Sequence, residues 1–297
     1  MLEKAVLPLA LIALMLGLGM TLRRDDFARI ARRKPVIAAA LASIFLVMPI
    51  IALGIGRISN LDASLSMGLV LLAVCPGGML SNMVTHSFRG DVVLSLALTV
   101  SSTFIYALVA PFIATLFLTH TAGGLASTVA AMLHVVAEVT GVVVVPLLIG
   151  MSLRSATPRF CARVDVPLRW AATCLVCLVF LWLGYSQVAT FEAAGWRLVG
   201  AVVLLNLSGW VLGGVIGLVF KLPISEFIAV GVEHSIRQEG TGVFVAVSIL
   251  RDRHMAIPLL VNSAVGFISA LLINGITVLL AGRKRPLAVE SVSTQMD

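Results

Sequence analysis

The segment that decides the fold is LVLLAVCPGGMLSN, residues 69–82, in which Pro76, Gly77 and Gly78 interrupt a long apolar stretch. Proline removes a backbone N–H donor and its ring clashes with the preceding helical turn, while glycine lets the backbone leave helical geometry. In lipid, non-helical backbone is tolerated only where protein or water satisfies its polar groups. A single proline in a membrane helix is usually a kink, but this combination predicts a true break in a helix.

A second interrupted stretch reads GVEHSIRQEGTG, residues 231–242. It places Glu233, Arg237 and Glu239 within an apolar span, and each charge costs about 2.5–3.5 kcal/mol to insert on a translocon scale. Glu233 and Arg237 are four residues apart, so a simple ion pair along one helix is the alternative interpretation. That pair would leave Gln238 and Glu239 unexplained, and we therefore predict a second broken helix here.

The composition places both segments in a membrane protein. Of 297 residues, 60% are apolar and 12% are charged, and the mean hydropathy is +1.08. An ordinary soluble domain is about 25% charged. We therefore predict an all-α polytopic membrane protein. This composition excludes a nucleic-acid-binding protein, a secreted disulfide scaffold and a cytosolic enzyme.

Nine apolar stretches are long enough to cross about 30 Å of hydrocarbon as helices. They lie near residues 4–22, 35–55, 62–87, 91–118, 128–153, 166–186, 195–220, 225–250 and 255–281. The connections are short, and we expect no appended soluble domain. We expect a single membrane transporter domain over residues 1–297 that ends in a cytoplasmic tail, residues 282–297.

The spacing of the stretches indicates an internal repeat. The starts of the first four stretches and of the last four differ by 162, 160, 163 and 164 residues. Each pair is separated by an odd number of crossings, so the two copies face opposite ways across the membrane. We predict a first repeat over about 4–118, an unpaired span over about 128–153 and a second repeat over about 166–281. Inverted repeats with two broken helices at matching positions are typical of secondary transporters.

The distribution of basic residues predicts the orientation. If the loop at residues 23–34 is cytoplasmic, the cytoplasmic side receives 14 Lys and Arg and the other side 5. Because cytoplasmic loops are enriched in Lys and Arg, we expect the N-terminus outside the cell membrane and the C-terminus inside.

Over Val74–Thr103 the chain resembles the bile acid:sodium symporter family, and Glu233 starts what looks like the family's second signature. The resemblance covers essentially the whole chain. It implies a panel of helices beside a core whose two unwound helices cross. It also implies sodium-coupled uptake of a small organic anion, with the sodium ion as the coupling ion and no other cofactor.

The resemblance further implies a sodium site between the two signatures. The family's ligands match Ser81, Asn82, Ser95, Thr99 and Glu233, all of which offer oxygen donors. Ser95 and Thr99 are four residues apart and share a helical face. Without the resemblance, hydroxyls of this kind are more often bonded to their own backbone or to a neighbouring helix.

A second sodium site of the family is altered in this chain. The usual pattern Glu-x-Gly-x-Gln-Asn has become Glu233 followed by Ser235, Arg237 and Gln238, and Ile44 stands where another Gln is expected. A guanidinium has no lone pair for a cation and carries a permanent positive charge. We therefore expect Arg237 to replace the second sodium ion and to pair with Glu233 or Glu239.

The expected substrate is a carboxylate bound in the crevice beside the crossing. Candidate contacts are Arg237, Gln238, Glu239 and, in the last span, Asn274, for which a hydrogen bond between helices is an equal alternative. Which anion is carried stays open.

Four other functions are alternatives to this one. An arsenite-type efflux permease would use Cys75 and Glu233, and a sodium-independent organic-anion carrier would dispense with the ion. An intramembrane enzyme is disfavoured because the chain contains neither His-Glu-x-x-His nor Gly-x-Ser-x-Gly. A scaffold or receptor would bind without transport.

Overall fold

The computed structural model describes residues 2–21, 33–122 and 125–282. Every regular element in these residues is a helix, and no strand is present among them. The prediction of an all-α chain is confirmed. Most of the basic loop at 23–34 and nearly all of the tail at 282–297 lie outside the described residues.

Six helices are long and apolar enough to cross a membrane by length and composition. They are α3–α4 (Lys34–Ala42 and Met48–Ile58), α7 (Val92–Ala122), α8–α9 (Leu125–Val139 and Val145–Ala156), α10 (Pro158–Ser186), α11 (Val188–Val219) and α14 (Ile257–Gly282). A seventh span is formed by α5 (Ala63–Val74) and α6 (Met79–Ser87), which are bent by 56° at the break between them.

Three shorter helices complete the description. They are α1 (Leu2–Thr21), α12 (Ile224–Ser235) and α13 (Glu239–Phe244), the last continued by a π-helical turn over Val245–Ile249. Each of the nine predicted apolar stretches therefore contains helix. The sixth helix begins at Pro158 rather than at 166, because a proline suits the first turn of a helix, where its missing N–H has no partner to lose.

Two further π-helical turns, Ser43–Val47 and Thr140–Val144, precede Pro49 and Pro146. Proline has no N–H to offer the carbonyl one turn before it, and its ring crowds that carbonyl. A wider turn relieves the clash while the helix continues. These turns join α3 to α4 and α8 to α9 without breaking either span.

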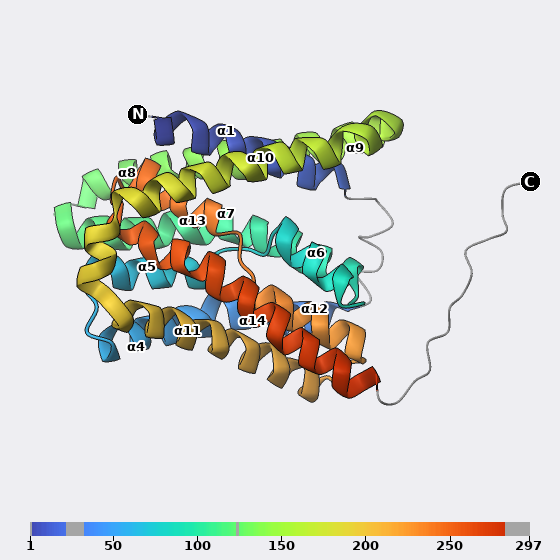
Figure 1. Ribbon diagram of the computed structural model, residues 1–297. Helices are drawn as coiled ribbons and strands as arrows, with labels where there is room; N and C mark the ends of the chain where they lie inside the picture. Colours follow the sequence, from blue (N-terminus) through green and yellow to red (C-terminus); the bar gives the residue numbers. More distant parts are fainter. Residues whose placement is uncertain (1, 22–32, 123–124, 283–297) are drawn as a thin grey trace, which may run out of the picture.

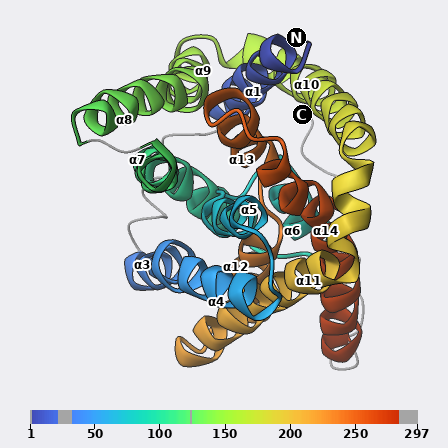
Figure 2. The same cartoon turned by 90° about the vertical axis from the view of Figure 1, so that its left-hand side faces the viewer.

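Helix α1 lies between α9 and α10, and the three run side by side along one edge of the molecule (Figures 1 and 2). The approach of α1 to α9 is close because two glycines face the opposite backbones. A Cβ on Gly19 would collide with the carbonyl of Leu147, and one on Gly150 with the carbonyl of Leu16. Small residues that let helix backbones approach are a common basis of packing in membranes.

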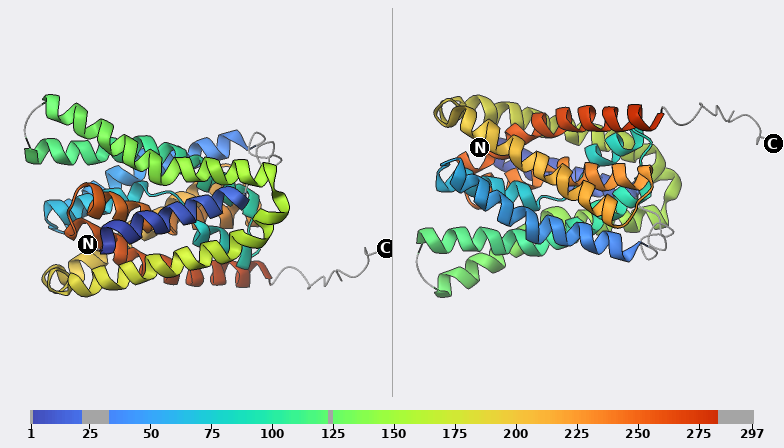
Figure 3. Two further views of the ribbon diagram at one scale, coloured as in Figure 1. Left: turned by 90° about the horizontal axis from the view of Figure 1, so that it is seen from above. Right: turned by 90° about the horizontal axis from the view of Figure 1, so that it is seen from below.

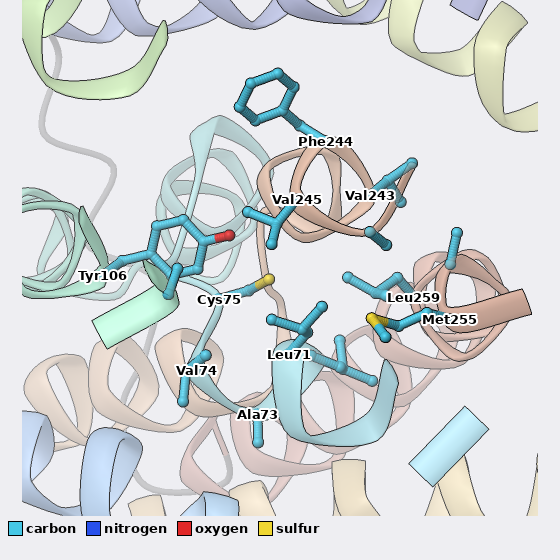
Figure 4. Packing of buried hydrophobic residues seen from close by; sticks show 14 of the residues in the cluster. Leu71, Ala73, Val74, Cys75, Tyr106, Val243, Phe244, Val245, Met255 and Leu259 are labelled. Carbon is cyan, nitrogen blue, oxygen red and sulfur yellow. The ribbon is translucent and has the colours of Figure 1, made fainter. Parts of the chain in front are cut away.

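Helix α8 continues α9 at one side of this layer, and the other helices pack beneath it, with α5 near the middle of the end-on view, α7 beside it and α13 between it and α1 (Figure 2). A cluster of buried apolar side chains joins them. Figure 4 shows the Cys75 sulfur inside this cluster, near Tyr106, Leu71 and Val245. The hydroxyl of Tyr106 donates to the carbonyl of Thr241 at 3.0 Å, so the cluster anchors the second break as well as the first.

Contacts between connecting segments fall into two groups at opposite ends of the bundle, whose helices run along a common direction (Figure 3). At one end the Ser64 hydroxyl donates to Asp252 at 2.5 Å. At the other, Arg33 pairs with Glu226, and the Asp91 N–H donates to the carbonyl of Ser225 at 2.8 Å. The first group belongs to the side predicted to be outside and the second to the side predicted to be cytoplasmic.

Candidate functional site

The two broken helices meet at their breaks. Helix α5 ends at Val74 and α6 begins at Met79, while α12 ends at Ser235 and α13 begins at Glu239. The N–H of Gln238 donates to the carbonyl of Pro76 at 2.8 Å, so one unwound segment satisfies the backbone of the other. The predicted breaks at Pro76–Gly78 and near Ile236–Gly240 are confirmed, although helix resumes at Glu239.

Gly77 permits the closest approach in the site. A Cβ at this position would collide with the carboxylate of Glu233, so only glycine leaves room for that side chain. Pro76 removes the N–H that would otherwise continue α5. The Pro-Gly-Gly sequence therefore serves two purposes, since it opens the first helix and admits a carboxylate from the second.

Three hydroxyls converge on one oxygen of Glu233. Ser81 donates to Oε1 at 2.6 Å, Ser95 at 2.8 Å and Thr99 at 2.9 Å. Ser81 comes from α6, Ser95 and Thr99 from α7, and Glu233 from α12, and all four side chains are buried. The helical spacing of Ser95 and Thr99 thus points both hydroxyls at the same acceptor.

Asn82 borders this group. Its Nδ2 donates to the carbonyl of Gly78 at 2.9 Å and to the Thr99 hydroxyl at 3.4 Å, whereas its buried Oδ1 has no hydrogen-bond partner. A buried acceptor without a partner costs free energy unless a ligand or water supplies one. The residues that the sequence predicts as sodium ligands are therefore gathered in one place.

The chemistry of this donor set fits a hard cation. Ser95 and Thr99 give their hydrogens to Glu233, and Ser81 shares its hydrogen between Glu233 and the carbonyl of Gly78 at 2.7 Å. Each hydroxyl oxygen keeps a lone pair that can face an ion. The carboxylate supplies negative charge, and Asn82 Oδ1 supplies a further neutral oxygen. Among the described residues no cluster of three or more His, Cys, Asp or Glu side chains could hold a metal ion, so a transition-metal centre has no ligand set there.

Arg237 lies in the second break and is buried. Its Nη1 donates to the carbonyl of Cys75 at 3.1 Å, whereas Nη2 has no hydrogen-bond partner. In the described part of the chain it forms no ion pair, so the predicted pairing with Glu233 or Glu239 is not observed. Helix α12 ends before Arg237, which removes the four-residue helical geometry, and the last carbonyl groups of α5 attract the guanidinium instead.

Glu239 is held by a chain of polar side chains that sequence reasoning missed. Its Oε1 accepts from Asn262 at 2.8 Å, and Asn262 in turn accepts from Asn206 at 3.2 Å. Asn206 also donates to the carbonyl of Ser235 at 3.0 Å and accepts from Ser269 at 2.7 Å. The available signal was an asparagine inside each of two predicted apolar stretches, Asn206 within 195–220 and Asn262 within 255–281.

Two other residues named from the sequence lie apart from the Glu233 hydroxyls. Asn274 is buried with its Nδ2 unpartnered, and it follows Asn262 by twelve residues on α14, or roughly 18 Å along a helix. Ile44 is buried beside Ser43, whose hydroxyl lies 2.6 Å from Nε2 of His234. No hydrogen bond among the described residues links Asn274 to either break, and the apolar side chain of Ile44 offers no oxygen to a cation.

A pocket of about 200 Å3 opens between the breaks and the edge layer. Its polar wall comes from the second break, where Arg237, Gln238 and Glu239 all line it. Its apolar wall comes from α1 and α10, including Leu14 and Phe180. The pocket can therefore receive a small molecule with a charged end and an apolar body.

The fold and the site define a class of protein, a helical membrane protein with two interrupted helices that meet beside a pocket. A model of the sodium bile acid symporter family matches residues 8–190, and the chain belongs to this family. The match includes the first break and its hydroxyls.

Curated relatives agree with this assignment. The probable sodium/metabolite cotransporter BASS1, chloroplastic, of Oryza sativa subsp. japonica is 28% identical over 262 residues, which cover 88% of this chain and 63% of that protein. The uncharacterized sodium-dependent transporter YocS of Bacillus subtilis is 25% identical over 78% of this chain and 71% of its own length. The hepatic sodium/bile acid cotransporter of Rattus norvegicus is 35% identical over 100 residues, 33% of this chain. The chain spans less than two thirds of the rice relative's length.

Proposed function

We propose that this protein is a sodium-coupled secondary transporter of a small organic anion. The observation that carries the proposal is the convergence of Ser81, Ser95 and Thr99 on Glu233 where the two broken helices meet. Unwound segments at a crossing of two helices are typical of ion and substrate sites in secondary transporters. Two of the relatives named above are sodium cotransporters, which supports the same function.

The proposed architecture comprises nine crossings arranged as an inverted repeat, with the unpaired span over about 128–153. In this proposal α1, α9 and α10 belong to the panel, and the two broken helices belong to the core that moves against it. The apolar side chains exposed on α10, such as Leu181 and Trp182, would face lipid. The protein would lie in the cell membrane with its N-terminus outside.

One sodium ion per cycle is proposed, held by Glu233, Ser81, Asn82, Ser95 and Thr99. Arg237 would supply a permanent positive charge where relatives bind a second ion, which links transport to a single cation. Arg237 contacts the Cys75 carbonyl rather than a carboxylate. Glu233 therefore forms no ion pair in the described residues, and its carboxylate would be able to face sodium.

The arsenite-type alternative needs Cys75 and Glu233 in one site. The Cys75 sulfur instead lies in the apolar cluster and receives only a long contact, 3.8 Å, from the Thr241 hydroxyl. Glu233 lies among hydroxyls from α6 and α7. These different surroundings favour an organic-anion transporter over a metalloid permease.

The test is uptake into proteoliposomes under an inward sodium gradient, with potassium as the matched condition. Glu233→Gln should abolish the sodium-dependent component, because it removes the negative charge that offsets the ion. The control is Glu138→Gln, which should transport normally. The native Glu138 carboxylate pairs with His134 outside the site. Normal sodium-driven uptake by Glu233→Gln would refute the site, and sodium-independent uptake by the native protein would support the uncoupled carrier.

The same assay measures the coupling ratio. Uptake by the native protein should depend on sodium with a Hill coefficient near one, since one ion site is proposed. The double variant Arg237→Gln with Ile44→Gln should raise this cooperativity by restoring two oxygen donors. Strong cooperativity in the native protein would contradict the role assigned to Arg237.

A further inference from the structure

The pocket beside the breaks carries both signs of charge on one short segment. Arg237 and Glu239, two residues apart, line it together, and neither forms an ion pair within the part of the chain that the structure describes. This inference rests on the proposed sodium-coupled transport of a carboxylate and revises only the net charge of the substrate: we infer that the preferred carboxylate belongs to a small zwitterion with an apolar body, of the amino-acid class, rather than to a simple organic anion.

The cationic side of the pocket is suited to a carboxylate. The Arg237 guanidinium is oriented by its bond to the Cys75 carbonyl, which uses Nη1 and leaves Nη2 without a partner. A buried donor of this kind is costly until an acceptor arrives. A substrate carboxylate would supply one and form a charge-assisted hydrogen bond, which is stronger than a neutral one.

The anionic side is suited to an ammonium group. Asn262 donates to Oε1 of Glu239 at 2.8 Å, and the carboxylate of Glu239 lies in the wall of the pocket, where it can accept from a ligand. The neighbouring Gln238 adds a buried amide oxygen, Oε1, that has no partner. The pocket wall therefore offers the Glu239 carboxylate and the unpartnered Gln238 oxygen beside the unpartnered Arg237 donor, which is complementary to a molecule that carries an ammonium and a carboxylate.

Glu239 also disfavours the simpler ligand. A monoanion in this pocket would gain from Arg237 but would lie near a second carboxylate, and like charges brought together cost binding free energy. Specificity arises from such unfavourable contacts with the wrong ligand as much as from favourable contacts with the right one. Glu239 therefore acts as a selectivity residue against plain organic acids.

The size and lining of the pocket limit the body of the substrate. At about 200 Å3 it is smaller than the 300–1,000 Å3 typical of sites for drug-sized ligands. Its wall includes Leu14, Met15 and Leu18 from α1 and Val176 and Phe180 from α10. A short aliphatic or aromatic side chain fits this lining, whereas a steroid skeleton exceeds it in this conformation.

The experiment compares ligands that differ only in charge. Binding to the purified, detergent-solubilised protein in sodium is measured by calorimetry for leucine, 4-methyl-2-oxopentanoate and leucinamide, and for the matching alanine and phenylalanine series. For at least one carbon skeleton the zwitterion should bind about tenfold or more tighter than its 2-oxo acid and its amide, a difference that one ion pair readily supplies.

Substitutions assign the effect to its residues. Glu239→Gln should reverse the order of affinities, so that the 2-oxo acid binds more tightly than the amino acid. Arg237→Met should weaken the binding of both the amino acid and the 2-oxo acid. The control Glu138→Gln should leave both affinities unchanged. Tighter binding of the 2-oxo acids by the native protein, or the absence of zwitterion binding in a preparation that sodium still stabilises, would overturn the inference. Either result leaves the Glu233 sodium site standing, because that site is tested separately by Glu233→Gln.

Discussion

At the scale of single residues, the site depends on a carboxylate that is buried without a cation of its own. Glu233 is surrounded by hydroxyls rather than by an arginine or lysine in the described residues. A buried charge is tolerated when it is hydrogen-bonded, and three donors to one oxygen meet that condition. The arrangement leaves the negative charge available to an incoming ion.

Substitution of Gly77 should impair sodium-dependent uptake as strongly as substitution of Glu233. In Gly77→Ala the new Cβ occupies the space of the Glu233 carboxylate, so the carboxylate must leave the hydroxyls. We expect loss of sodium-dependent uptake at near-normal expression. Gly200→Ala, where no atom lies within 4 Å of the added Cβ, is the control. Full sodium dependence in Gly77→Ala would show that the carboxylate does not need this position.

Thr99→Val removes one hydroxyl donor while keeping the shape of the side chain. A hydrogen bond to a charged group contributes about 1.5–3 kcal/mol, so the half-saturating sodium concentration should rise roughly ten- to hundredfold. Thr115→Val on the same helix is the matched control, because the Thr115 hydroxyl bonds only the Pro111 carbonyl within its own helix. Equal sodium titration curves for the two variants would exclude Thr99 from the ion site.

At the scale of helices, two kinds of small-residue contact set the geometry. The Pro-Gly-Gly break lets α5 and α6 bend by 56° around the second break. The Gly19–Gly150 contact brings α1 against α9 with the backbones nearly touching. The first contact forms the proposed ion site, and the second fixes the apolar wall of the pocket, since Leu14 and Leu18 project from the same α1.

Gly150→Ala should therefore separate α1 from α9. Overpacking of a close interface costs about 1–3 kcal/mol, so the melting temperature in detergent should fall by several degrees. Gly141→Ala lies in the same span with no atom within 4 Å of its added Cβ and should melt like the native protein. Unchanged melting of Gly150→Ala would mean that the two helices are not packed through these glycines.

At the scale of the whole molecule, the connecting segments separate into two ends. The predicted orientation places Glu192 outside and Ser155 inside, and both side chains are exposed. With the four native cysteines replaced by alanine, Glu192→Cys should react with a membrane-impermeant maleimide in intact cells. Ser155→Cys should react only after permeabilisation. The reverse pattern would invert the orientation and the direction of sodium-driven transport.

The sequence by itself determined the helical class and the positions of the two breaks, because apolar runs of membrane length and Pro-Gly-Gly are local chemistry. The residues around Glu233 followed only from the resemblance to the symporter family, since the helical spacing of Ser95 and Thr99 alone does not indicate an ion site. The sequence also indicated Arg237 as a site residue, but the predicted pairing of Arg237 with Glu233 or Glu239 was wrong. The i, i+4 rule presumes a continuous helix, and here the helix ends at Ser235.

Only the tertiary structure decided which distant groups face one another. Asn262 and Asn206 lie 23 and 33 residues from Glu239 in the sequence, and Cys75 lies 162 residues from Arg237, so no local pattern links them. Their contacts follow from how α11 and α14 pack against α12 and α13, which depends on the fit of whole helix faces. The opposite charges in the pocket remain separate for the same reason, since each is held by a partner from another helix.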